Sequence, residues 1–237
     1  MPTLSVLQPA YLPWIGFFDK VIQSDVFVYY DTAQYVHNDF LNRNKIKMSD
    51  GDRYLTVPVL TTGKLGQSIL ETKIDNARNW QKKHCLSIEQ AYKKAPYYAQ
   101  FAPDILSIIR RSHTSLSQLN IEVIESILEK ANLASHGDRY IASNLVAEGR
   151  VRLDGSATEN LIELCKAFGC DRYITGMDLS YLDTGLFGDR GIEIVSRQFG
   201  GNLEYPTYPQ LHGEFVSHLA AINMLLNVGS LDMLTAL

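Results

Sequence analysis

The chain has 237 residues, of which 46% are hydrophobic and 20% are charged, and its formal net charge is −4. These values are typical of one globular domain, and no stretch approaches the ~20 consecutive apolar residues that a membrane-spanning helix needs. A mildly acidic chain is a poor candidate for general nucleic-acid binding, which usually requires a basic surface. The first residues lack the basic and long apolar regions of a signal peptide, so we expect a cytoplasmic protein with no membrane insertion.

The N-terminal segment predicts a strand, a helix and a second strand. Residues 3–8 are mostly apolar and are followed by Pro9, residues 14–23 carry apolar side chains at helical spacing, and residues 26–30 are β-branched and aromatic. Two strands joined in this way by a helix form a βαβ unit, in which the strands are parallel. We therefore expect an α/β fold with a mostly parallel sheet.

The next segment has a weaker pattern. Residues 38–47 are polar and predict no regular element, whereas residues 54–60 predict a strand that Pro58 would confine to the edge of a sheet. Residues 69–74 predict a further strand.

Residues 76–134 are nearly all helical in pattern, and we expect them to form a helical insert in, or a cap on, the sheet of a single domain that covers residues 1–237. After this region the pattern alternates again between strand and helix, which favours more parallel sheet. The predicted strands are 141–145, 172–175 and 192–197, and the predicted helices are 157–169 and 214–227.

The familiar motifs of several enzyme classes are absent from the sequence. It contains no G-x-G-x-x-G, no P-loop, no G-x-S-x-G and no H-E-x-x-H. Cys85, Cys165 and Cys170 do not have the C-x-x-C spacing of redox or zinc sites, so we expect reduced core thiols and no metal site.

The first cluster of candidate site residues follows the first predicted strand. Open α/β sheets bind ligands at the carboxyl ends of their strands, so Gln8 and Tyr11 are candidates for binding a substrate there. Tyr11 and Trp14 offer rings that stack on a base or a sugar, and the helix that follows offers free N–H groups to an anion. The alternative for Trp14 is a place in the core.

The second cluster follows the second predicted strand and consists of Asp31, Gln34 and Tyr35. In a parallel sheet this strand ends beside the first one, so Asp31 is expected to face the same crevice as Gln8. A carboxylate there accepts hydrogen bonds from sugar hydroxyls or amines. The alternative is that Asp31 caps a turn or a helix.

The third cluster is a basic run formed by Asn42, Arg43, Asn44 and Lys45. Arginine suits bidentate capture of a phosphate and lysine supplies a point charge, so this run predicts a local anion site in a chain of negative net charge. A solvated loop without a ligand is the alternative.

Two weaker candidate sites remain. Trp80 and His84 are spaced to share one face of a helix, and His84 is either a proton acceptor or a packed histidine. Gly176 and Tyr181 follow the predicted strand 172–175, where they serve either a binding site or an ordinary turn.

These clusters resemble the WbqC-like family of bacteria, whose members tend to be encoded among genes for O-antigen and other surface polysaccharides. The resemblance implies a role in making a modified sugar, and the activity proposed for the group is transfer of glycine or a similar aminoacyl unit to an amino sugar. The residues that carry it include Gln8-Pro9-x-Tyr11-x-Pro13-Trp14-x-Gly16-Phe17, Tyr30-Asp31-x-x-Gln34-Tyr35, Asn42-Arg43-Asn44-x-Ile46, Trp80-x-x-x-His84 and Tyr173-x-x-Gly176.

A remoter resemblance concerns the fold. The segment Trp14-Ile15-Gly16-Phe17 follows a strand and Gln-Pro, where nucleotidylyltransferases and class I synthetases, the HUP-like proteins, carry His-x-Gly-His. This likeness implies a Rossmann-like fold. Tryptophan and phenylalanine cannot bind and polarise a phosphate as those histidines do, so the likeness does not imply adenylyl transfer by the same mechanism.

Taken together, these observations predict an enzyme that binds a nucleotide-linked amino sugar and acylates its amine. Its phosphates are expected on Arg43, Lys45 or the first helix N-terminus, and Asp31 and then His84 are the expected proton acceptors. The donor is an activated amino acid, a thioester or an aminoacyl-tRNA, and no cofactor is specified. Two alternatives stay open: a non-catalytic sugar-nucleotide binding protein of the same pathway, and a nucleotidylyltransferase-like enzyme with an altered phosphate site.

Overall fold

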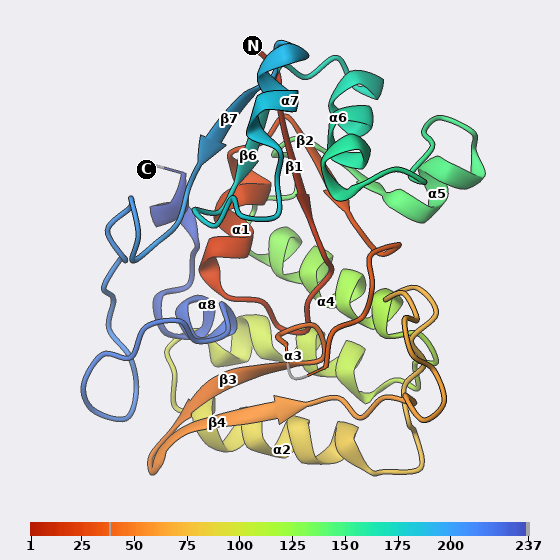
Figure 1. Cartoon of the computed structure of the whole chain (residues 1–237). Helices are drawn as coiled ribbons and strands as arrows, with labels where there is room; N and C mark the ends of the chain where they lie inside the picture. Colours follow the sequence, from red (N-terminus) through yellow and green to blue (C-terminus); the bar gives the residue numbers. More distant parts are fainter. Residues whose placement is uncertain (38, 236–237) are drawn as a thin grey trace.

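A parallel sheet of five strands lies at the centre of the computed structural model, which describes residues 1–37 and 39–235 (Figure 1). The strand order is β5-β2-β1-β6-β7, and each pair of neighbours is parallel. The predicted mostly parallel, Rossmann-like α/β fold is therefore confirmed. The strands are β1 (Thr3–Leu7), β2 (Val26–Tyr29), β5 (Asp138–Ile141), β6 (Arg172–Thr175) and β7 (Glu193–Ser196).

The direction in which the chain winds across the sheet changes between β1 and β6. From β1 the chain passes through α1 (Ile15–Ile22) to β2 on one side, whereas β6 lies on the other side of β1 and continues through α7 (Thr184–Asp189) to β7. In open α/β sheets, ligands bind outside the carboxyl ends of the strands at such a switch point. The fold therefore directs attention to the loops that follow β1 and β6.

Each face of the sheet packs against its own hydrophobic cluster. Phe27 and Tyr29 of β2 join the larger cluster with α1, whereas Leu4, Val6 and Val28 join the smaller one on the opposite face. This division follows from the alternation of side chains along a strand.

None of the helices in the described part of the chain has both the length and the apolar character needed to cross a bilayer. Besides α1 and α7, the helices are α2 (Trp80–Tyr92), α3 (Tyr98–Arg110), α4 (Leu116–Lys130), α5 (Ala142–Ala147), α6 (Ala157–Ala167), α8 (Ile222–Val228) and a short 3-10 helix, η1 (Asp232–Leu234).

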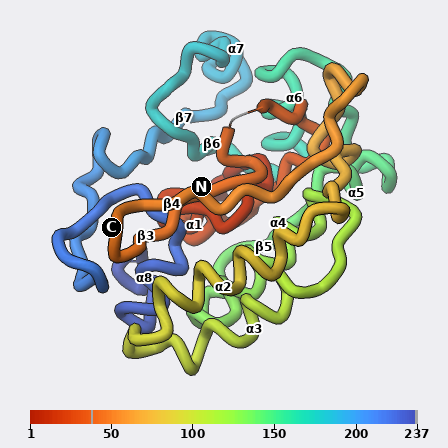
Figure 2. Tube along the Cα trace, turned by 90° about the horizontal axis from the view of Figure 1, so that it is seen from below, coloured from red at the N-terminus to blue at the C-terminus, as the bar shows by residue number. Residues whose placement is uncertain are grey.

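The region predicted to be a helical insert, 76–134, contains α2, α3 and α4. In Figures 1 and 2 these helices lie together on one side of the molecule, and α2 contacts the hairpin strand β3 (Arg43–Met48). Their apolar side chains belong to the same cluster as those of α1 and α8. The helices thus extend the larger core beyond the sheet.

An antiparallel hairpin corrects two of the predictions. Strand β3 pairs with β4 (Gly51–Thr56) in a separate two-stranded sheet, so residues 43–47 of the polar stretch are strand and the strand predicted at 54–60 ends at Thr56. Asn44, Ile46 and Met48 are buried at alternate positions, but Asn44 is polar and Lys47 is buried as well, so the sequence shows no clear alternation of apolar and polar residues.

Three further predicted elements are wrong. The strand expected at 69–74 is a turn at residues 69–71, followed by isolated bridges of Lys73 with Ser115 and of Ile74 with Val59. The Thr72 hydroxyl, which donates to the carbonyl of Ser68 at 2.7 Å, favours this turn over strand pairing. The strand expected at 141–145 ends at Ile141, where α5 begins. The helix expected at 214–227 begins only at Ile222 and corresponds to α8.

Candidate functional site

Two cavities flank the carboxyl ends of the strands around the switch point, one beside each hydrophobic cluster. The first, which we call the tyrosine cavity, has a volume of about 360 Å³. The second, which we call the tryptophan cavity, has a volume of about 320 Å³. The loop after β1 contributes Gln8 to the first and Ala10, Pro13 and Trp14 to the second.

The tyrosine cavity combines aromatic walls with neutral polar groups. Gln8, Tyr30, Tyr173 and Tyr181 line it with aliphatic side chains of β1 and α6. The Asn160 amide donates to the Tyr30 hydroxyl at 3.2 Å, and the hydroxyls of Tyr181 and Thr175 lie 3.0 Å apart. Burial raises the pKa values of Tyr30 and Tyr173, so both phenols stay neutral near pH 7. Such walls suit a sugar or nucleoside ring.

The tryptophan cavity is mostly apolar and carries a few polar groups. The rings of Trp14, Phe17 and Phe40 line it, together with Asn44, Gln198 and His218. The ring of His218 stacks on that of Trp14, with 5.1 Å between centroids and 21° between planes. A planar or small polar group in this cavity would meet an imidazole held against an indole.

His218 has a backbone conformation that is rare for a residue with a side chain. Its φ is +57°, in the left-handed region, which costs about 1–2 kcal/mol outside glycine. The backbone N–H donates to the Tyr205 hydroxyl at 2.9 Å, and Nδ1 lies 2.8 Å from the Ser217 hydroxyl. These contacts orient an exposed imidazole at the cavity. The sequence reasoning missed His218, because its stacking partner Trp14 comes from the other end of the chain.

Asp31 lies at the end of β2, as the sequence predicts, but its carboxylate is engaged. It is 1% exposed, and it accepts hydrogen bonds from the backbone N–H of Ser143 at 3.0 Å and from the Ser143 hydroxyl at 2.6 Å. Ser143 stands in the first turn of α5. Asp31 therefore accepts a hydrogen bond from a backbone N–H group at the start of this helix, which agrees with the alternative of a capping residue.

His84 lies inside the larger core. It is 5% exposed, its Nδ1 is 3.0 Å from the hydroxyl of Tyr11, and its ring packs edge-on against Trp80. Burial lowers the pKa of His84 to about 4 and raises that of the fully buried Tyr11. The two residues form a neutral buried pair, and neither is among the residues that line the two cavities.

The basic run is on the hairpin and its polar groups are largely occupied. The Asn42 amide donates to the carbonyl of Val57 at 2.7 Å, and the Asn44 amide donates to the carbonyl of Leu12 at 2.7 Å. Lys45 forms an ion pair with Asp52 at 2.8 Å. Both amides thus hold loops in place.

A third cavity of about 230 Å³, which we call the basic cavity, lies beside this run. Tyr35, Asn42 and Arg43 line it together with Arg78, whose guanidinium forms an ion pair at 3.5 Å with Asp75, another lining residue. The Arg43 guanidinium also lies 4.7 Å from the ring centroid of Tyr54.

The structure distributes the predicted site residues over separate places. Gln34 is exposed and makes an isolated bridge with Ser68, and Gly176 directly follows β6. The others divide as follows: Gln8 and Tyr181 at the tyrosine cavity, Trp14 and Asn44 at the tryptophan cavity, Tyr35, Asn42 and Arg43 at the basic cavity, Lys45 on the hairpin, and Tyr11, Asp31 and His84 in buried hydrogen bonds.

The described part of the chain contains three cysteines and several side chains of the types that bind metal ions. No three His, Cys, Asp or Glu side chains converge there as a metal ion requires. The three cysteines are free and buried, and burial raises the pKa of Cys165 to about 12 and that of Cys170 to about 11. Thiols with such values are protonated near pH 7 and are weak nucleophiles.

Comparison with known proteins gives a family for the chain. The model of the WbqC-like protein family matches residues 8–234. The chain is also 32% identical over 232 residues to an uncharacterized protein of Mycobacterium tuberculosis (strain ATCC 25618 / H37Rv), Rv1507c, and the match covers 97% of this chain and 95% of that protein. No solved structure matches the chain.

Proposed function

The chain belongs to the WbqC-like protein family, and we propose that it is a cytoplasmic transferase that moves an aminoacyl unit, glycine or a similar one, to the amine of a nucleotide-linked amino sugar for O-antigen or another surface polysaccharide. The observation that carries this proposal is the tyrosine cavity at the switch point of the sheet. Gln8, Tyr30 and Tyr181 offer amide and phenol groups around an aromatic floor, as recognition of a sugar ring requires.

The chemical step requires a group that accepts a proton from the attacking amine. The amine nitrogen forms a bond to the carbonyl carbon of the donor, the bond from that carbon to the leaving group breaks, and the amine loses one proton. The leaving group is a thiolate, a tRNA hydroxyl or a phosphate, according to the donor.

We assign the proton acceptor to His218, whose imidazole lies at the tryptophan cavity. Asp31 and His84 are less suited, because their side chains are buried and hydrogen-bonded to Ser143 and Tyr11. Their predicted catalytic roles stay predictions.

The test is a reaction of the full chain with amino-sugar nucleotides and glycine donors, followed by mass spectrometry. UDP-, dTDP- and GDP-linked amino sugars are first screened by thermal shift, and each one that binds is then incubated with glycyl-tRNA, with a glycyl thioester, and with glycine and ATP. We expect a product heavier by one glycyl residue. His218→Asn should lower its rate about 100-fold or more while the sugar nucleotide still binds, as the loss of a general base predicts.

The same experiment tests a second function, that of a non-catalytic sugar-nucleotide binding protein. The engagement of Asp31 and His84 in structural hydrogen bonds favours this reading. Tight binding without product under any donor would support it and refute the transferase. Transfer of a nucleotidyl group would instead identify the nucleotidylyltransferase-like alternative.

A further inference from the structure

Lys20 is a largely buried lysine whose ammonium group makes no hydrogen bond to the described residues. It stands on α1 and is 8% exposed, and among the residues that the structure describes no acceptor lies within hydrogen-bonding distance of its Nζ. Lysine is almost never buried unless its charge is paired. The position therefore calls for an explanation.

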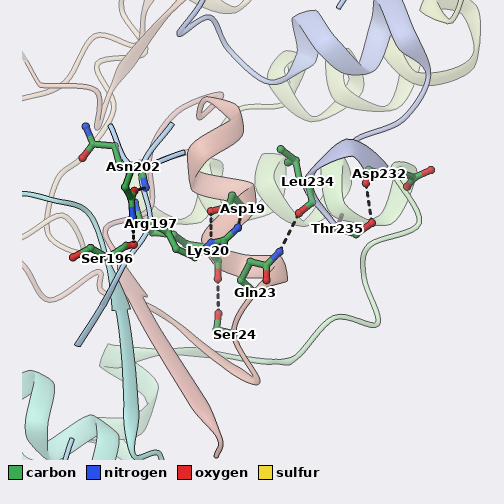
Figure 3. Close-up of polar contacts among 11 residues, drawn as sticks. Asp19, Lys20, Gln23, Ser24, Ser196, Arg197, Asn202, Asp232, Leu234 and Thr235 are labelled. Atoms are coloured by element: carbon green, nitrogen blue, oxygen red, sulfur yellow. Dashed lines mark hydrogen bonds and ion pairs between the residues drawn. The ribbon is translucent and has the colours of Figure 1, made fainter. Parts of the chain in front are cut away.

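The neighbouring carboxylate does not supply that hydrogen bond. Arg197 donates to both oxygens of Asp19, from Nε at 3.1 Å and from a terminal nitrogen at 2.8 Å. Figure 3 shows Asp19 and Lys20 side by side with Arg197. Burial is the largest effect on Lys20 and lowers its pKa, while Asp19 attracts its charge and Arg197 repels it.

The ammonium of Lys20 lies at the switch point of the sheet. A Cβ placed on Gly176, directly after β6, would lie 4.0 Å from Lys20 Nζ and 3.5 Å from Gln198 Oε1. The Gln198 side chain accepts a hydrogen bond from the backbone N–H of Met177 at 3.1 Å and also lines the tryptophan cavity. The absence of a side chain at Gly176 leaves room beside the cation at the place where α/β sheets bind ligands.

We propose that Lys20 binds an oxyanion of the ligand, a phosphoryl or carboxylate group, beside Gly176 at the carboxyl end of β6. A largely buried ammonium without a hydrogen bond is costly in the free protein, and an anionic ligand would lower that cost on binding. This site differs from the phosphate sites predicted on Arg43 and Lys45. The proposed role of Lys20 in binding an oxyanion applies both to a transferase and to a protein that only binds the sugar nucleotide.

The test compares two buried lysines. Lys47 is 4% exposed, but its ammonium donates to Gln210 Oε1 at 3.1 Å and to the carbonyls of Gly213 and Glu214. Lys20→Met and Lys47→Met each remove one buried charge from the full chain. Binding of UDP, which carries phosphoryl groups, and of glycine, which carries a carboxylate, is measured by calorimetry.

We expect Lys20→Met to weaken binding of UDP or glycine at least 10-fold, whereas Lys47→Met keeps the affinity of the unmodified chain. Binding of UDP would identify the oxyanion as a phosphoryl group, and binding of glycine would identify it as a carboxylate. Without ligand, Lys20→Met should raise the thermal midpoint, because it removes a largely buried charge that makes no hydrogen bond. Lys47→Met should lower the midpoint, because it leaves acceptors unsatisfied. Gly176→Ala, whose Cβ meets only ordinary contacts, should weaken binding several-fold in a folded protein.

The proposal is refuted if neither probe binds, or if Lys20→Met binds both as tightly as the unmodified chain does. A fall in the midpoint of unliganded Lys20→Met as large as that of Lys47→Met would also refute it, because Lys20 would then have a structural role. None of these readouts depends on turnover, so failure of the Lys20 proposal can be distinguished from failure of the transferase proposal.

Discussion

At the scale of single residues, Tyr11 and His84 show how a motif that resembles an active site can belong to the core. The spacing of Trp80 and His84 correctly predicts a shared helix face, and Tyr11 follows β1 as expected. Their burial could not be predicted, because it depends on α2 packing against the loop after β1. No local pattern in the sequence reports that contact.

The buried imidazole makes stability depend on pH. The pKa of His84 is about 4 in the folded chain and about 6.5 when unfolded, so between these values only the unfolded state takes up the proton. The contribution of His84 to the free energy of unfolding should therefore be fully present above about pH 6.5 and decrease as the pH drops towards 4. The loss is roughly 3 kcal/mol from this residue.

Urea unfolding at pH 7.5 and at pH 5 measures this dependence. His84→Gln lacks the titrating group and should lose most of the difference between the two pH values. An equally steep dependence in His84→Gln would show that another group is responsible.

At the scale of elements, the start of α5 illustrates what local sequence patterns miss. Residues 141–145 are apolar enough to predict a strand, but the carboxylate of Asp31 from the end of β2 accepts the hydrogen bonds of Ser143 and starts a helix there. The cap comes from a residue far away in the sequence. By contrast, α6 begins with the local capping box of Ser156 and Glu159 and was predicted near its true start.

Substitution of Asp31 separates its capping role from a catalytic one. Asp31→Asn keeps one acceptor oxygen for Ser143 but weakens charge-assisted hydrogen bonds, so we expect a loss of about 1–2 kcal/mol in the free energy of unfolding. Glycyl transfer should remain within a few-fold of the unmodified rate at a temperature where the variant is folded.

Ser143→Ala provides the matched control, since it removes the hydroxyl partner and leaves the carboxylate in place. It should lose a similar free energy of unfolding. If Asp31→Asn abolished transfer while Ser143→Ala did not, Asp31 would be the base and the assignment of His218 would be wrong.

At the scale of the whole molecule, the parallel sheet was predictable because its first two strands and the intervening helix form a compact βαβ pattern. That sheet also led to the expectation that Gln8 and Tyr181 lie at strand ends, where the tyrosine cavity is found. The hairpin was missed because buried polar residues such as Asn44 obscure its alternation, and it places Arg43 at the basic cavity. Lys20 and His218 could not be predicted, because their surroundings are assembled from both ends of the chain.

The most direct test of the central claim is a crystal structure of the full chain with a bound UDP-linked amino sugar. The account predicts that the ligand lies across the carboxyl ends of β1 and β6, with its sugar or base against Tyr30 and Tyr181 and its charged groups towards Lys20. A ligand bound instead in the basic cavity between Arg43 and Arg78, or away from the ends of the strands, would contradict it.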